Sequence, residues 1–147
     1  MNLDEYDRAI LRELQVDGRM PVANLAKAVG LSETGTRNRL QKMLQSDAIQ
    51  VVAVGQPRLL GIDVEAMLGV AVKGDPRVAA KAFGEVPEVM NVMICAGRFQ
   101  LMVNLICKDN YALEQLLTDQ IRPIEGVEQL EIFIYLECAK DSYNWCP

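Results

Sequence analysis

PVANLAKAVGLSETGTRNRLQKMLQ, residues 21–45, is the stretch that decides the fold of the N-terminal part of the chain. At helical spacing its apolar residues form two short helices joined by a tight turn. Gly30 ends the first helix, because glycine adopts a positive φ without steric cost. Ser32 caps the second helix, because its hydroxyl can accept a hydrogen bond from a free backbone N–H. Two helices joined in this way are typical of a helix-turn-helix.

The second helix of this pair has a neutral-to-basic polar face that suits the DNA major groove. Arg37 can bind guanine with two hydrogen bonds, and Asn38 can do the same with adenine. Small residues at the helix N-terminus allow close approach to bases or phosphate, and two further basic residues are expected to contact phosphate. Of the basic residues, Arg39 and Lys42 are the expected phosphate contacts. The full set of predicted DNA-binding residues is Ser32, Thr34, Gly35, Arg37, Asn38, Arg39, Gln41 and Lys42. The alternative is a helical hairpin whose polar face is only solvated.

The flanking residues complete an N-terminal domain of three helices. Asp4 can cap a first helix, which ends at the turn Asp17-Gly18-Arg19. After the motif, IQVVAV (residues 49–54) is rich in β-branched residues and predicts a strand. The domain is therefore a winged helix-turn-helix, or this strand pairs elsewhere. We place the domain at residues 1–54 and a linker at 55–65.

Residues 66–147 predict a second domain with the element order βαββαβ, the ferredoxin-like split βαβ motif. The expected strands are 66–72, 89–96, 99–107 and 127–137, and the expected helices are 77–83 and 109–122. The whole chain is then of the α+β class. Strand 66–72 is apolar on both faces, so the sheet needs a cover where its helices leave it open. We therefore predict a homodimer through this domain.

Composition excludes several classes of protein. Half of the 147 residues are apolar, which excludes disorder, and no apolar run reaches the ~18 residues of a membrane helix. The acidic N-terminus lacks an apolar signal core, so we expect a cytoplasmic protein. The chain has no histidine, and its four cysteines form no CxxC pair. We therefore expect reduced cysteines, no metal site and no cofactor.

Charge is distributed unevenly along the chain. Residues 1–60 carry eight Lys or Arg and seven Asp or Glu, whereas residues 61–147 carry seven and thirteen, so the net charge of −5 arises in the C-terminal part. A nearly neutral DNA-binding domain should bind weakly as a single copy, because neutralising phosphates supplies much of the affinity. Several copies in one assembly would compensate.

Four segments together resemble the Lrp/AsnC family of transcription regulators, also called feast/famine regulators. They are LDEYDRAILRELQVDGR (3–19), LAKAVGLS (25–32), QPRLLGID (56–63) and CAGRFQLMVNLICKD (95–109). The resemblance implies an N-terminal domain that binds double-stranded DNA. It also implies a ferredoxin-like domain that assembles dimers into tetramers or octamers. A small-molecule effector, often an amino acid, would bind where hairpin turns meet between dimers, at Ala96, Gly97, Arg98, Phe99 and Gln100.

Three positions depart from the family's usual pattern. Gly35 replaces a residue that is often Thr or Pro, and Asp47 stands where a Gly usually precedes the strand. The hairpin usually reads Gly-x-Tyr-Asp, whereas this chain ends that motif with Gln100, which can hydrogen-bond an ammonium group but cannot form an ion pair with it. The effector then differs from a typical amino acid, or is absent. Arg98 favours an acidic ligand, or is simply an exposed arginine in a turn.

The sequence thus predicts a sequence-specific DNA-binding transcriptional regulator that is oligomeric and tuned by an amino-acid-like effector. The alternative is a ligand-binding oligomer whose degenerate helix-turn-helix does not read DNA. An enzyme is not expected: the haem-pathway decarboxylases that resemble this family rely on histidines, which this chain lacks. Tyr143 and Trp145 in the tail suggest that the C-terminus docks on a neighbouring subunit, with a loose tail as the alternative, and Cys146 is expected near the surface.

Overall fold

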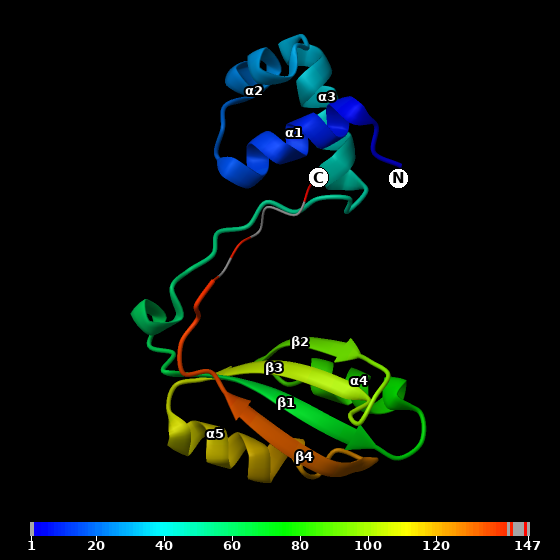
Figure 1. Cartoon of the computed structure of the whole chain (residues 1–147), viewed down its shortest axis with the longest axis vertical. Coiled ribbons are helices and arrows are strands. Elements are labelled where there is room, and N and C mark those ends of the chain that lie inside the picture. Colours follow the sequence, from blue (N-terminus) through cyan, green and yellow to red (C-terminus); the bar gives the residue numbers. More distant parts are fainter. Residues whose placement is uncertain (1, 141, 143–145, 147) are drawn as a thin grey trace. The chain divides into compact units, whose positions relative to one another are not determined.

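A computed structural model describes residues 2–140, 142 and 146 of the chain (Figure 1). Contacts within the chain define two units. The first comprises Met1–Val54 together with Lys140–Pro147, and the second comprises Gly55–Ala139. Tyr143 and Trp145, which we expected to dock, lie outside the described residues. In the described ranges no helix is both long and apolar enough to cross a membrane.

The first unit contains the three predicted helices, α1 (Glu5–Val16), α2 (Val22–Val29) and α3 (Glu33–Gln45). Its small core is formed by fully buried side chains of α1, α2 and α3, namely Ile10, Leu25 and Met43. The predicted caps are confirmed. Asp4 accepts a hydrogen bond from the Asp7 N–H at 2.9 Å and completes a capping box, and Gly30 ends α2 with φ 71°.

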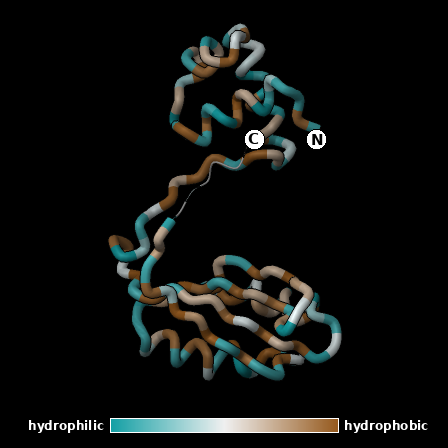
Figure 2. Tube along the Cα trace, viewed as in Figure 1, coloured by the Kyte–Doolittle hydropathy of each residue, from teal (hydrophilic) through white to brown (hydrophobic). Residues whose placement is uncertain are grey.

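The strand predicted at residues 49–54 is wrong. This segment is largely hydrophobic, as Figure 2 shows, but it has no regular secondary structure. Ile49 packs into the core of the first unit, whereas Val51, Val52 and Val54 are exposed. β-Branched residues favour an extended backbone, but a strand also needs a neighbour for its hydrogen bonds. Within the described residues no strand pairs with this segment, so the described helix-turn-helix carries no wing.

The second unit is a four-stranded antiparallel sheet in the order β2-β3-β1-β4. Its strands are β1 (Val64–Val72), β2 (Val89–Ile94), β3 (Leu101–Cys107) and β4 (Val127–Ile134). Helix α4 (Pro76–Gly84) follows β1, and α5 (Asn110–Leu116) follows β3 and continues as a π-helical turn, η2 (Leu117–Ile121). A short 3-10 helix, η1 (Pro57–Leu60), precedes the sheet. The βαββαβ order and the α+β class are thus confirmed, with strands β2 and β3 shorter than predicted at the hairpin turn.

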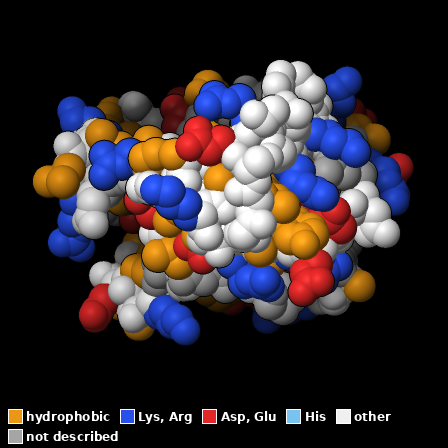
Figure 3. All heavy atoms as spheres, turned by 90° about the horizontal axis from the view of Figure 1, so that it is seen from above, with side chains coloured by type: hydrophobic (Ala, Val, Ile, Leu, Met, Phe, Trp, Pro, Cys, Tyr) orange, Lys and Arg blue, Asp and Glu red, His pale blue; other side chains and the backbone are white. Residues whose placement is uncertain are grey.

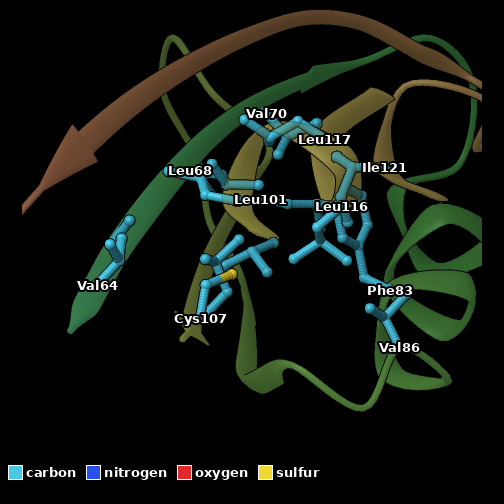
Figure 4. Packing of buried hydrophobic residues seen from close by; sticks show 14 of the residues in the cluster. Val64, Leu68, Val70, Phe83, Val86, Leu101, Cys107, Leu116, Leu117 and Ile121 are labelled. Carbon is cyan, nitrogen blue, oxygen red and sulfur yellow. The ribbon is translucent and has the colours of Figure 1, made fainter. Parts of the chain in front are cut away.

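The core of the second unit lies between the sheet and the two helices. Alternate residues of β1 and β3 point toward α4 and α5, where they pack against Phe83 and Ile121 (Figure 4). Hydrophobic and hydrophilic residues alternate along α5, so only one side of that helix enters the core (Figure 2). Burying each large apolar side chain contributes roughly 1.5–3 kcal/mol. The opposite face of the sheet, which we call the outer face, is not covered by these helices.

Candidate nucleic-acid interface and ligand site

Helix α3 is fixed by its own first turn and by its buried side. The Ser32 hydroxyl accepts a hydrogen bond from the Gly35 N–H at 3.1 Å, and the Thr36 hydroxyl donates to the Ser32 carbonyl at 3.0 Å. Thr36 and Met43 are fully buried. This orientation leaves most polar residues of α3 exposed, including Glu33 and Gln45 at its ends. The exposed residues that were predicted to bind DNA, which we call the exposed group on α3, are Thr34, Arg37, Asn38, Gln41 and Lys42.

The local structure explains why position 35 is a glycine. A Cβ at this position would lie 3.1 Å from the Ser32 hydroxyl oxygen, which is tighter than ordinary van der Waals contact. Glycine therefore leaves room for the cap, and α3 forms an uninterrupted helix from Glu33 to Gln45 despite the glycine. The departure from the family's usual residue does not break the recognition helix. The Ser32 side chain is exposed, and its hydroxyl caps α3.

Arg39, a predicted phosphate contact, contacts residues of α1 and its cap. Its Nη1 atom lies 2.7 Å from Asp4 Oδ2 and 2.8 Å from Asp7 Oδ1, and its guanidinium lies over the Tyr6 ring at 5.4 Å from the ring centroid. The predicted phosphate contact is thus engaged by three residues of α1 and its cap. Arg39 ties α3 to α1 and does not belong to the exposed group on α3.

Electrostatics around this contact are consistent with a fixed ion pair. The Asp7 N–H lowers the pKa of the Asp4 carboxyl below its ordinary value, and Arg39 lowers it further. The same two carboxylates raise the pKa of Arg39. Asp4 and Asp7 were recognisable in the sequence as first-turn acids, but nothing local indicates that a residue more than thirty positions away would face them.

The surface of the molecule has no single strongly basic patch in the view of Figure 3. Lys and Arg side chains there are separated by uncharged, apolar and acidic ones. This agrees with the near-neutral charge of residues 1–60. The face seen in Figure 3 therefore offers no continuous basic surface of the kind that would supply strong phosphate binding.

The turn between β2 and β3 is held by Gln100. Its side-chain oxygen accepts a hydrogen bond from the Val72 N–H at 3.0 Å, and its side-chain nitrogen donates to the Gly97 carbonyl at 3.1 Å. Its own N–H donates to the Val70 carbonyl at 3.0 Å. Gly97 has φ 146°, in the range that favours glycine. Gln100 therefore fixes the turn to β1, a use that the sequence did not reveal.

Arg98 and Phe99 fold over the outer face of the sheet. The Phe99 ring covers Gly69 in β1, where a Cβ would lie 2.5 Å from the ring. Arg98 Nη2 lies 3.2 Å from Glu131 Oε2 in β4, and both side chains remain substantially exposed. These residues border a cavity of about 260 Å³ lined by Arg98, Phe99, Gln129, Leu130 and Glu131. Of the five predicted effector residues, only Arg98 and Phe99 line it.

Two models of protein families match the chain. The AsnC-type helix-turn-helix domain matches residues 3–44, and the Lrp/AsnC ligand binding domain matches residues 65–145. The chain belongs to the Lrp/AsnC family. Like its relatives in this family, it is a DNA-binding transcriptional regulator with a helix-turn-helix and a ligand-binding domain.

The similarity of this Lrp/AsnC regulator to known relatives extends over nearly the whole chain. The HTH-type transcriptional regulator FL11 of Pyrococcus horikoshii is 32% identical, with 95% of this chain and 93% of the relative covered. The proline dehydrogenase transcriptional activator of Rhizobium radiobacter is 29% identical, with 96% and 94% covered.

Solved structures agree with the same family. AsnC of E. coli superimposes with a TM-score of 0.85 at 27% identity, covering 97% of this chain and 98% of AsnC. A transcriptional regulator of Neisseria meningitidis in complex with L-Met gives a TM-score of 0.86, covering 97% and 96%. At 22% identity, this second likeness shows the fold alone.

The described part of the C-terminal tail contacts the first helix. The Cys146 N–H donates to Gln15 Oε1 at 3.1 Å, so this part of the tail lies against α1 of the same chain.

Among the residues that the structure describes, no group of three or more His, Cys, Asp or Glu could hold a metal ion.

Proposed function

We propose that this Lrp/AsnC regulator reads specific DNA sequences with the exposed side of α3. Arg37 and Asn38 contact base edges, Thr34 and Gln41 border them, and Lys42 contacts phosphate. The observation that carries this proposal is the orientation of α3. Thr36 and Met43 are buried on one side, and the predicted base readers are exposed on the other.

An assembly of at least two copies supplies the affinity that one nearly neutral domain lacks. The outer face of the sheet supports a homodimer, because its β2 and β4 strands expose large apolar residues such as Met93 and Phe133. Two recognition helices would then meet half-sites separated by one or more turns of DNA, about 34 Å per turn. Assembly into tetramers or octamers would link several such sites.

The turn between β2 and β3 is the proposed effector site. Arg98 offers a cation and Glu131 an anion at one cavity, a pairing that suits the carboxylate and ammonium groups of an amino acid. Gln100 contributes by holding the turn in place and not by touching the ligand. The L-Met complex of the Neisseria regulator supports an amino acid as the ligand class. The effector acts by binding one assembly state more tightly than another.

This role requires no chemical step, and we propose that the protein is not an enzyme. A regulator acts in the compartment that holds its DNA, so we propose a cytoplasmic location. The intact cap and continuous α3 support DNA reading over the alternative of a degenerate helix-turn-helix.

The test is selection from a pool of genomic DNA fragments at near-physiological salt, followed by sequencing of the retained fraction. We expect a palindromic motif to be enriched, with half-site spacing that reports the dimer geometry. Folded, oligomeric protein that enriches no motif would contradict the proposal and favour the ligand-binding oligomer. Repeating the selection with each amino acid added tests the effector.

A further inference from the structure

A second cavity lies at the opposite end of β3 from the hairpin turn. It has a volume of about 300 Å³ and is lined by residues around η1, the start of β2, the end of β3 and α5, including Ile62, Glu88, Cys107 and Lys108. The backbone fixes these segments to one another. The Ile106 N–H donates to the Glu88 carbonyl at 2.9 Å, and the Asp63 N–H donates to the Lys108 carbonyl at 3.1 Å. The cavity is therefore bordered by segments that are hydrogen-bonded to one another within the second unit.

Glu88 has an unusual environment in this cavity. Its Oε2 atom is buried, and it has no hydrogen-bond partner among the residues that the structure describes. A buried carboxylate oxygen without a donor is costly, because it has lost its hydration without a compensating hydrogen bond. No cation of the described residues lies within 4.0 Å of this carboxylate. This oxygen lacks a hydrogen-bond donor among the described residues, and a positively charged donor would in addition pair with the carboxylate.

The rest of the lining defines what such a donor is attached to. Ile62, Pro87, Ile106 and Ala112 are apolar, whereas Lys108 is exposed and supplies a cation. Cys107 does not provide a competing charge. Burial raises the pKa of its thiol, and Glu88 and Asp109 raise it further, so the thiol is protonated at neutral pH. The cavity thus combines a half-buried carboxylate side chain with one buried oxygen, an exposed lysine and an apolar wall.

We propose that this cavity is a second ligand site, which binds a small apolar amino acid. The ligand's ammonium group donates to the Glu88 carboxylate, its carboxylate pairs with Lys108, and its side chain lies against the apolar wall. Because Glu88 and Lys108 lie at the end of β3 remote from Arg98, this site is distinct from the proposed effector site at the hairpin turn. It depends neither on the DNA-reading role of α3 nor on the effector site.

The test is calorimetric titration of the full-length protein, without DNA, with L-alanine, L-valine, L-leucine, L-isoleucine and L-methionine. For the ligand that binds most tightly, we expect E88Q to weaken the affinity by about tenfold or more, since the charge-assisted hydrogen bond to the ligand's ammonium group is lost. K108A should weaken the same affinity by a smaller factor, because its charge is exposed. K108A also guards against misfolding of E88Q, since it alters no buried group.

The matched control is E85Q, which removes an exposed carboxylate only three residues before Glu88. Its affinity should equal that of the unmodified protein. R98A separates the two sites, because it should leave binding at Glu88 unchanged. Absence of binding by all five amino acids would overturn the proposal. So would binding that R98A weakens while E88Q and K108A do not, which would place the only ligand at the hairpin turn.

Discussion

Arg39 of α3 and Asp7 of α1 form an ion pair with 2.8 Å between Nη1 and Oδ1. The Asp7 side chain is only 6% exposed, so one end of this contact is buried. Asp4, which caps α1, contacts the same Arg39 nitrogen at 2.7 Å. The cap of the first helix and the orientation of the recognition helix are therefore coupled through one arginine.

This coupling predicts how acid affects the first unit. Because the pKa of Asp4 is lowered in the folded state, its stabilising effect is present above the ordinary value of 3.8 and is lost as the pH falls through the lowered value. D4N keeps a side chain that can cap α1 but removes this titration. We expect urea unfolding of the first unit to depend less on pH in D4N than in the unmodified protein between about pH 5 and pH 2. Equal pH dependence in the two proteins would show that the Asp4 contacts do not form.

The close contact between Gly69 and Phe99 predicts that a larger residue at position 69 destabilises the second unit. A methyl group at this position would meet the Phe99 ring at 2.5 Å, so G69A must displace the ring. We expect G69A to lower the free energy of unfolding by roughly 1–3 kcal/mol, as overpacking usually does. In F99A the further change G69A should cost much less, because the two residues are in contact.

G84A is the matched control for that experiment. A Cβ at Gly84 would meet no atom within 4 Å, and the residue ends α4. This substitution should leave urea stability unchanged or raise it by about 0.5–1 kcal/mol. If G69A were as well tolerated as G84A, Phe99 would not lie over β1.

The backbone conformation of Asp47 predicts that replacing it with glycine stabilises the protein. It adopts φ 52°, a left-handed conformation that costs most residues about 1–2 kcal/mol and costs glycine nothing. The turn after α3 therefore has the conformation for which glycine is suited, although this chain has aspartate. D47G should raise the free energy of unfolding by about 0.5–1 kcal/mol, and D47A should lower it. Chemical denaturation of both variants checks the sign, and a loss of stability in D47G would contradict this explanation.

Local signals explain what could be predicted from the sequence. The caps Asp4 and Ser32 and the glycine at position 30 act within one turn of their helices, so the helix-turn-helix was readable directly. The apolar run that forms β3 likewise indicates a strand, although the sequence does not show which of its sides is buried. These features depend on residues that are close together in the chain.

Long-range partners explain what could not be predicted. Residues 49–54 have the composition of a strand, but a strand exists only where another one pairs with it. Gln100, a predicted effector residue, accepts a hydrogen bond from the Val72 N–H, 28 residues away, and no local pattern in the sequence indicates this partner. Glu88 gave no local signal at all, because its isolation depends on how η1, β2, β3 and α5 meet.

The central claim is that Arg37 and Asn38 read bases, and the most direct measurement is fluorescence anisotropy with an enriched DNA site and a scrambled duplex. We expect R37A and N38A each to lower the ratio of specific to non-specific affinity by roughly 10- to 100-fold, as loss of a bidentate base contact does. R19A, an exposed arginine outside α3, should leave this ratio unchanged. If R37A and N38A kept the ratio of the unmodified protein, α3 would not read DNA through these residues, and the proposed DNA interface would be wrong.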